Sequence, residues 1–393
     1  MKNNRKLNKL LFILDGYPIG NSTSCVFVRN LIIALTKLDV VCTVITPQIF
    51  KGKKSIPYYQ EEITENGSLI SIYSPYYLHF TSYPLTLKYS MQSHTNSVIK
   101  TIEREKISFD AIYGHFIYQC GLTAAKIGKM YHVPSFLGAG ESDKLLPHST
   151  RNRSAYVTGM KQCGWKEILA TVSGVISVSE WTKKLLIDGG FITNENLIGV
   201  FPNGVDTSVF TTCDKMLRRK QLNIDPKCFL LVYVGAFNEN KGYKRVCEAI
   251  KLDSLNSINS VFIGRQDDGI PDCQSIVFCG RCNNERVAQY LQAADCFVLP
   301  TRSEGCCNAI LEALSCGLPV ISSDRPFNDG ILDETNSIRI NPDDITEIYD
   351  AIITLKNDEE RRNKLSIGAK QSASRFDISL RAKRVLEFMN EHL

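Results

Sequence analysis

The stretch Asp295–Val320, DCFVLPTRSEGCCNAILEALSCGLPV, decides the fold of this chain. It opens on a short apolar run, Cys296–Leu299, which is closed by Pro300 and is typical of a fully buried parallel strand. A polar loop follows, and then a helical pattern ends at Gly317 with Pro319 just beyond it. The stretch therefore predicts strand, loop and helix, with the loop at the carboxyl end of a parallel strand, where open α/β sheets bind their ligands.

Two carboxylates lie in this stretch, Glu304 in the loop and Glu312 inside the helix, with seven residues between them. The backbone N–H groups at the start of the helix lie at the positive end of its dipole and favour a phosphate. A ligand with a diphosphate between two hydroxylated rings would use all three features. The alternative that both acids are solvated stays open, because exposed glutamates are common. The backbone N–H groups that would bind the phosphate at the start of the helix belong to Gly305, Cys306, Cys307 and Asn308.

The segment LPTRSEGCCNAILEALSCGLPVISSD, which contains both acids, resembles the E-x7-E motif of the retaining glycosyltransferases of family 4. The resemblance implies the GT-B fold, an α/β fold of two facing Rossmann-like parallel-sheet domains with a C-terminal helix that crosses back to the N-terminal domain. It also implies that Glu304 lies against the donor sugar and that Glu312 holds the ribose.

Strand-like apolar runs alternate with helical patterns from end to end, which is typical of parallel sheets. The segment Val200–Phe210 carries a Pro-Asn-Gly turn and resembles the family's crossing between domains. We therefore predict an N-terminal acceptor-binding domain over residues 1–205 and a C-terminal nucleotide-sugar-binding domain over 206–375. A returning helix is predicted over 376–393, and residues 207–225 are predicted as the linker.

The second domain opens with an apolar strand, Phe229–Val234, followed by the loop GAFNENKG. In the family this loop carries an Arg after the first Gly and a Lys before the second, and both neutralise the diphosphate. Here Lys241 occupies the second place, but Ala236 stands at the first. The resemblance thus assigns Lys241 to the diphosphate and leaves Arg245 and Arg281 as candidates for the missing charge. Either arginine is equally explained as a solvated surface residue.

A buried strand of the first domain ends at His115, and a side chain at the carboxyl end of a parallel strand lies at the ligand edge. The family has a His here that points at the donor sugar, so His115 joins Glu304 and Lys241 as the predicted catalytic residues. Without the resemblance, a lone His is more often structural. Glu141 and Asp143 are weaker candidates, for acceptor contacts, in a segment that reads GESD where relatives read HGSD.

Composition indicates a soluble globular protein, with 44% hydrophobic and 22% charged residues among 393. The net charge of +5 predicts no nucleic-acid partner but suits an anionic membrane surface. No apolar run spans a bilayer and no signal peptide is recognised, so we expect a cytoplasmic location. Residues 51–95 mix Lys with Tyr and Phe. That mixture suits peripheral contact with the inner face of the plasma membrane, or a connecting hairpin and helix.

Fourteen cysteines without a secretion signal predict free thiols in a reducing compartment. Cys279 and Cys282 form a C-x-x-C, but no second pair or His cluster at zinc spacing accompanies them, so ordinary strand-end cysteines are favoured over a zinc site. The sequence has no D-x-D that could clamp a metal–diphosphate. We therefore expect neither a metal nor a cofactor.

The residues and the resemblance together predict a retaining glycosyltransferase. It would move a sugar from a UDP- or GDP-linked donor to a hydroxyl of a saccharide or lipid-linked saccharide, in the synthesis of a cell-envelope polysaccharide such as capsule or O-antigen. Two alternatives stay open: a GT-B epimerase acting on the nucleotide sugar, and a non-catalytic sugar-nucleotide-binding partner of an assembly complex. A nicotinamide dehydrogenase is disfavoured because the first loop lacks the G-x-G-x-x-G pattern.

Overall fold

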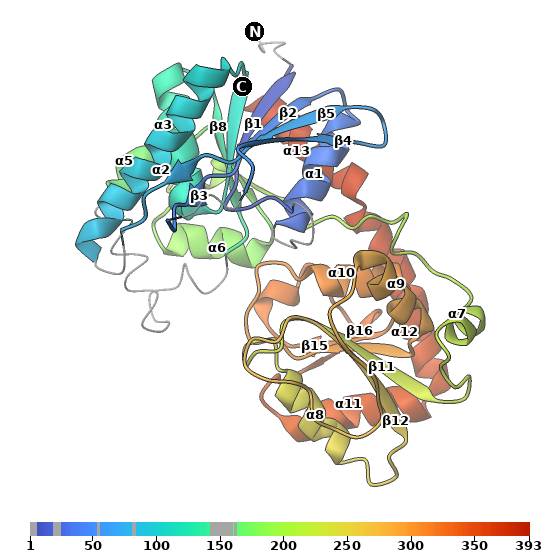
Figure 1. Ribbon diagram of the computed structural model, residues 1–393. Helices are drawn as coiled ribbons and strands as arrows, with labels where there is room; N and C mark the ends of the chain where they lie inside the picture. The colour runs from blue at the N-terminus through green and yellow to red at the C-terminus, as the bar shows by residue number, and fades with distance from the viewer. Residues whose placement is uncertain (1–5, 19–24, 53–55, 81–83, 142–159, 161–162) are drawn as a thin grey trace. The chain divides into compact units, whose positions relative to one another are not determined.

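Alternating strands and helices build two α/β units in the computed structural model (Figure 1), which describes residues 6–18, 25–52, 56–80, 84–141, 160 and 163–393. One unit comprises Met1–Pro202 together with Ser379–Leu393, and the other comprises Asn203–Ile378. The first unit therefore ends at Pro202, three residues before the predicted boundary at 205. The returning segment begins at Ser379, three residues after the predicted start at 376.

The N-terminal unit contains an eight-stranded sheet in the order β10-β9-β8-β7-β1-β2-β5-β4. Its strands pair in parallel except for the antiparallel β4–β5 hairpin. The strands are β1 (Lys9–Ile13), β2 (Val41–Ile45), β4 (Tyr59–Ile63), β5 (Leu69–Tyr73), β7 (Ala111–His115), β8 (Ser135–Ala139), β9 (Gly174–Ser177) and β10 (Ile198–Val200). Every residue of β7, β8 and β9 is buried, as expected for strands covered on both faces.

Two short strands, β3 (Gln48–Ile49) and β6 (Tyr76–Tyr77), pair in parallel beside this sheet. The helices of the unit are α1 (Val26–Thr36), α2 (Pro84–Glu105), α3 (Leu122–Tyr131), α5 (Trp165–Leu169), α6 (Glu180–Asp188) and all but the first residue of α13 (Ile378–Glu391). The returning helix α13 is held by packing: a Cβ added to Gly174 would lie 2.9 Å from the Phe388 ring. Its Asn390 side chain also accepts a hydrogen bond from the Leu7 N–H at 2.8 Å.

The second unit contains a six-stranded parallel sheet in the order β13-β12-β11-β14-β15-β16. Its strands are β11 (Phe229–Val234), β12 (Ile258–Ile263), β13 (Ile276–Gly280), β14 (Cys296–Leu299), β15 (Val320–Ser323) and β16 (Ser337–Ile340). Its helices are α7 (Lys215–Gln221), α8 (Tyr243–Lys251), α9 (Asn284–Ala293), α10 (Asn308–Ser315), α11 (Ile345–Asn357) and α12 (Glu359–Ala373). The strand, loop and helix predicted for the deciding stretch are thus β14, its following loop and α10, and the α/β class with two parallel-sheet units is confirmed.

The prediction of a plain linker over residues 207–225 is wrong, because α7 lies inside it. Asp214 caps this helix through the Leu217 N–H. On its inner face the buried Arg219 guanidinium donates to the Ala293 carbonyl at 2.9 Å and pairs with the Asp295 carboxylate at 2.6 Å. These bonds hold the segment against the second unit.

Candidate active site

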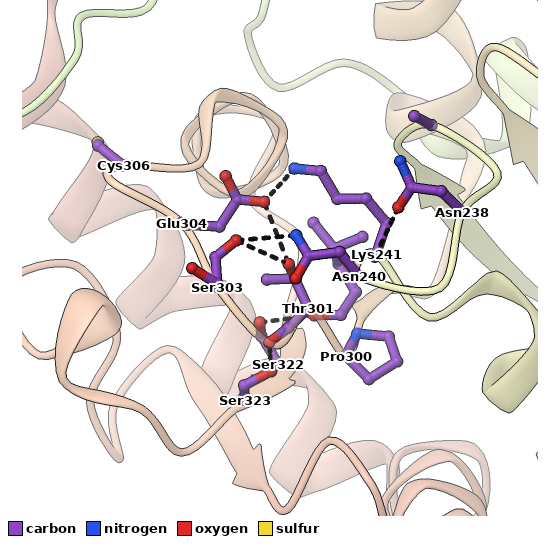
Figure 2. A network of polar contacts seen from close by, with 12 residues as sticks. Asn238, Asn240, Lys241, Pro300, Thr301, Ser303, Glu304, Cys306, Ser322 and Ser323 are labelled. Atoms are coloured by element: carbon purple, nitrogen blue, oxygen red, sulfur yellow. Dashed lines mark hydrogen bonds and ion pairs between the residues drawn. The ribbon is translucent and has the colours of Figure 1, made fainter. Parts of the chain in front are cut away.

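The central pair of strands in the second unit places two loops at one edge of the sheet. Strand β11 pairs in parallel with β14, so the loops that follow both strands lie at the same carboxyl edge. Two hydrogen bonds join these loops. The Arg302 N–H donates to the Asn240 carbonyl at 2.9 Å. The Asn240 side chain donates to the Ser303 carbonyl at 3.0 Å (Figure 2). The two loops therefore form a single surface.

Lys241 and Glu304 meet on this surface as an ion pair (Figure 2). The Thr301 hydroxyl donates to the same carboxylate oxygen at 3.2 Å, and Asn238 accepts a hydrogen bond from the Lys241 N–H at 3.0 Å. The two side chains are only 23% and 15% exposed. Burial alone would lower the pKa of Lys241, but the adjacent Glu304 carboxylate outweighs burial and raises it. The ammonium group is thus charged at neutral pH, and the carboxylate is held in place from two sides.

The next strand, β15, supports the loop that carries Glu304. The Ser322 hydroxyl donates to the Leu299 carbonyl at 2.7 Å, and the Ser323 hydroxyl donates to the Thr301 carbonyl. Thr301, Ser322 and Ser323 are fully buried. Because buried, satisfied polar groups resist displacement, the loop is ordered before any ligand binds.

The predicted phosphate-binding N–H groups stand where α10 begins. The helix starts at Asn308, and the preceding Cys307 has an extended backbone and makes no side-chain hydrogen bond to the first turn. That first turn contains no acidic residue. The positive end of the helix dipole is therefore neither capped by the Cys307 side chain nor neutralised by an acid of the first turn, and this suits an anionic ligand.

Asn203 holds the start of α10, a contact that sequence reasoning missed. Its side-chain amide donates to the Cys306 carbonyl at 3.3 Å and to the Asn308 side chain at 2.9 Å. Its backbone N–H donates to the Cys306 thiol at 3.3 Å, and the residue is 5% exposed. The Pro-Asn-Gly turn indicates only a domain boundary, whereas the structure also gives its Asn a part in ordering the N-terminal end of α10.

Glu312 lies inside α10, one helical turn before Cys316, and is half-buried. Burial raises the pKa of its carboxyl group to about 7. An unliganded Glu312 therefore changes charge near neutral pH, and a ligand that donates hydroxyl groups to it favours the ionised form. Its assignment to the ribose remains a prediction from the resemblance.

The two arginines proposed to replace the missing charge have different surroundings. Arg245 is buried, and its guanidinium donates to the Pro300 carbonyl at 2.8 Å and to the Glu239 carbonyl at 2.9 Å. Burial lowers the pKa of Arg245, and the charge of Arg302 lowers it further. The Arg245 side chain thus links the two loops through hydrogen bonds to one carbonyl of each. Arg281 is exposed and follows β13, which lies two strands away from β11.

His115 is the last residue of β7 in the N-terminal unit and is 1% exposed. Its Nδ1 lies 2.8 Å from the Tyr113 hydroxyl, while its buried Nε2 has no hydrogen-bond partner among the described residues. A Cβ at Gly138 would lie 1.9 Å from the Tyr113 hydroxyl and 2.5 Å from His115 Nδ1, so only glycine fits there. The imidazole is thus tightly packed at the end of the strand, and its role toward the donor sugar remains a prediction from the resemblance.

The two acceptor candidates are less informative. The Glu141 carboxylate is buried and accepts a hydrogen bond from the Ile117 N–H at 2.6 Å, which closes the turn after β7. Asp143 lies outside the described residues. In the described part of the chain no three His, Cys, Asp or Glu side chains come together as a metal site. Cys279 and Cys282 are free thiols, and burial raises the pKa of each.

Two buried histidines should make the free energy of unfolding fall at acidic pH. Burial lowers the pKa of His94 to about 3, and burial together with the nearby Arg381 charge lowers that of His115 to about 3. In the unfolded chain both titrate near about 6.5. The unfolded state therefore binds more protons below this pH, and each histidine should lower the free energy of unfolding by about 1.4 kcal/mol per pH unit as the pH falls from about 6.5 toward about 3.

Urea unfolding at a series of pH values checks this. His94→Gln and His115→Gln should each flatten the acid limb of the stability curve, whereas His132→Gln, at the exposed end of α3, should leave it unchanged. An acid limb as steep in both variants as in the wild type would contradict burial of the neutral imidazoles.

A comparison with protein-family models matches residues 214–372 to the family described as Glycosyl transferases group 1. Among curated proteins, a Bacillus subtilis glycosyltransferase assigned to teichuronic acid biosynthesis is 28% identical over 375 residues, covering 89% of this chain and 90% of that protein. An Escherichia coli galactosyltransferase named for transfer from UDP-Gal to a GlcNAc-diphosphoundecaprenol acceptor is 27% identical, covering 67% of this chain and 70% of its own length.

Solved structures share the fold over nearly the whole chain. Sucrose-phosphate synthase from Thermosynechococcus elongatus superposes with a TM-score of 0.77 at 16% identity, covering 98% of both chains. HepE of Anabaena, solved in complex with UDP and glucose, superposes with a TM-score of 0.73 at 17% identity, covering 97% of this chain and 99% of that one. In no described helix do length and apolar character suffice for crossing a membrane.

Proposed function

The chain is a glycosyltransferase of GT-B type whose group 1 domain spans residues 214–372, and on this premise we propose that it is a retaining enzyme of family 4. It transfers a sugar from a UDP- or GDP-linked donor to a hydroxyl of a saccharide or lipid-linked saccharide, in the synthesis of a cell-envelope polysaccharide. The observation that carries the proposal is the Lys241–Glu304 ion pair at the start of α10, with Glu312 farther along the same helix.

Each part of this constellation suits one part of a nucleoside-diphosphate sugar. The N–H groups at the start of α10 and the Lys241 ammonium take the diphosphate, since both are positive and lie at one sheet edge. The Glu312 carboxylate accepts hydrogen bonds from the ribose hydroxyls. The Glu304 carboxylate, held by Thr301 and Lys241, lies against the donor sugar.

The reaction exchanges one bond at the anomeric carbon for another on the same face of the sugar. The bond to the diphosphate oxygen breaks, and the bond to the acceptor oxygen forms. The acceptor's proton passes to an oxygen of the departing diphosphate. Positive charge grows on the sugar and negative charge on the diphosphate, so Glu304 and Lys241 both gain interaction energy on the way to the transition state.

A lipid-linked acceptor would bring the enzyme to a membrane surface, and the N-terminal unit has side chains suited to such contact. Large apolar side chains around β3, β6 and the first half of α2 are exposed next to Lys51 and Lys88. Aromatic and basic side chains of this kind favour the interface of an anionic bilayer. These apolar side chains are those of Ile49, Phe50, Leu78, Phe80 and Tyr89.

The test is transfer of labelled sugar from a panel of UDP- and GDP-sugars to short saccharides and to saccharides linked to undecaprenyl diphosphate. We expect one donor to be consumed only when an acceptor is present, and the anomeric configuration of the donor to be kept in the product. Interconversion of the donor sugar without any acceptor would replace the proposal by an epimerase. Transfer with inverted configuration would remove the family 4 assignment.

Transfer should also survive exhaustive EDTA treatment, because Lys241 and the helix N-terminus supply the positive charge that a metal ion would otherwise bring to the diphosphate. The rate with and without EDTA is the measurement. Activity lost on chelation and restored by one particular divalent ion would contradict this expectation.

A further inference from the structure

A cavity of about 860 Å³ lies in the N-terminal unit, between α2 and the segments on either side of the β4–β5 hairpin. Its size falls within the range of small-molecule sites. It is lined by Ile56 and Tyr58 before β4, by Pro75 and Tyr76 after β5, and by the second half of α2. None of the residues assigned to the donor or the acceptor lines it.

The two side chains of β6 point to opposite sides of the strand, so this cavity and the turn that follows β7 lie on different sides of β6. Successive side chains of a strand point to opposite sides. Tyr77 is buried, its ring packs 5.0 Å from His94 and its hydroxyl lies 3.4 Å from the Gln119 amide, in the turn that follows His115. Tyr76 points the other way and lines the cavity. The cavity therefore lies on the far side of β6 from the turn after His115.

The walls of the cavity combine aromatic rings with few aliphatic groups. Tyr58 and Tyr76 line it with aromatic rings, and the Arg104 guanidinium lies over one face of the Tyr58 ring. Tyr76 is fixed because its hydroxyl accepts a hydrogen bond from the Ile56 N–H at 3.0 Å. Ile56 and Pro75 are the aliphatic members. An acyl or isoprenoid chain would find little aliphatic surface here, whereas the C–H face of a sugar ring packs well on tyrosine.

One cation of the lining is available to a ligand. The Arg104 guanidinium is occupied by the Glu105 carboxylate at 2.7 Å and by the Tyr58 ring, 3.9 Å from its centroid. The side-chain ammonium of Lys100, one turn earlier on α2, has no ion pair or hydrogen bond to any other described residue. Glu103 also lines the cavity, so a bound anion must sit on the Lys100 side.

We propose that this cavity binds an acidic saccharide, with sugar rings against Tyr58 and Tyr76 and a carboxylate on Lys100. The cavity would hold a stretch of a uronic-acid-bearing polymer. This binding does not depend on glycosyl transfer, and only its benefit to polymer synthesis rests on the proposed function. An anionic polymer chain so held stays near the enzyme between successive transfers, because a second contact raises the effective concentration of the first.

Calorimetric titration of the full chain with tetragalacturonate tests this, with maltotetraose as the uncharged probe of equal length. The wild type should bind tetragalacturonate in the presence of saturating UDP or GDP and bind maltotetraose at least about tenfold more weakly. Lys100→Glu should weaken tetragalacturonate binding by at least about tenfold, and Ser97→Trp, which fills the cavity from α2, should abolish it. Lys129→Glu, at an exposed lysine in the last turn of α3 and outside the cavity, is the control and should bind as the wild type does.

Lys100→Glu and Ser97→Trp should both keep the wild-type rate of transfer to a short acceptor. This result would separate the cavity from the site of transfer. Absence of binding by the wild type would overturn the proposal, as would equal binding by Lys100→Glu and Ser97→Trp. If vesicles of phosphatidylglycerol, and not the saccharide, lose binding in Ser97→Trp but keep it in Lys129→Glu, the cavity takes a lipid and the proposal is wrong.

Discussion

Lys241→Ala should lower kcat by about 10²–10³ and change KM for the donor much less, because the negative charge that Lys241 meets grows as the diphosphate departs. The same variant leaves the partly buried Glu304 without its cation. Steady-state kinetics with the donor identified in the panel give both parameters, and Lys241→Arg should recover part of kcat by restoring the charge.

Lys244→Ala is the matched control, since Lys244 lies three residues further on, is exposed and has its ammonium 5.8 Å from the centre of the Tyr243 ring. It should turn over donor like the wild type. Wild-type kcat in Lys241→Ala would contradict the role of Lys241, and the positive charge would then have to come from Arg245 or Arg281.

Glu304→Gln should lower kcat by about 10²-fold while leaving the affinity for free UDP or GDP close to that of the wild type. Gln keeps the size of the side chain and an acceptor oxygen for the Thr301 hydroxyl, so the loop should keep its shape. Only the negative charge that stabilises the developing positive charge on the sugar is lost. The measurements are kcat and a titration with the nucleoside diphosphate.

Glu285→Gln, an exposed acid in the first turn of α9, is the control for the loss of one carboxylate. A Glu304→Gln enzyme with normal kcat would remove Glu304 from the reaction. An equal loss of kcat and of diphosphate affinity would instead show that Glu304 acts by holding Lys241.

Much of the second unit could be predicted because its strands are short apolar runs with clear ends. The predicted spans of β11 and β14 match the structure residue for residue. β14, for example, is four buried residues closed by a proline. Continuous apolar runs of this kind fit only a sheet covered on both faces, and the Gly and Pro residues that follow them mark where the ligand edge begins.

The long helix α2 could not be predicted in the same way. It is rich in Ser, Thr, His and Asn, which are weak helix formers. Tertiary contacts bury Ser90, His94, Thr95 and Thr101 in the folded unit, and His94 Nδ1 lies 2.9 Å from the Thr123 hydroxyl. Of the two interpretations of residues 51–95, the hairpin and helix is the one that the structure contains. Membrane contact by the same region remains a proposal.

The pairing of Lys241 with Glu304 could not be predicted from the sequence either. The two residues are 63 positions apart, and they meet because β14 pairs with β11 although β12 and β13 intervene in the chain. The resemblance supplied a separate role for each residue but no sheet order. The sequence position of Arg245 alone makes it a candidate for the diphosphate. The structure shows instead that its guanidinium donates hydrogen bonds to two loop carbonyls.

In the function proposed above, the carboxyl edge of the second unit, with α10, binds the nucleotide of the donor. The most direct test is the shift of melting temperature produced by UDP-, GDP- and CMP-sugars at pH 8, where Glu312, with its pKa raised to about 7, is ionised. A donor at 100 times its Kd should stabilise the wild type by about 2.7 kcal/mol. Glu312→Ala should lose most of this stabilisation, because ribose hydroxyls bonded to a charged acceptor are worth about 1.5–3 kcal/mol.

Glu360→Ala, which removes an exposed acid from the first turn of α12, controls for the loss of charge and should keep the full shift. We predict that a UDP- or GDP-sugar raises the melting temperature of the wild type and of Glu360→Ala but hardly that of Glu312→Ala. An equal shift in all three proteins, or no shift with any nucleotide sugar, would contradict the account.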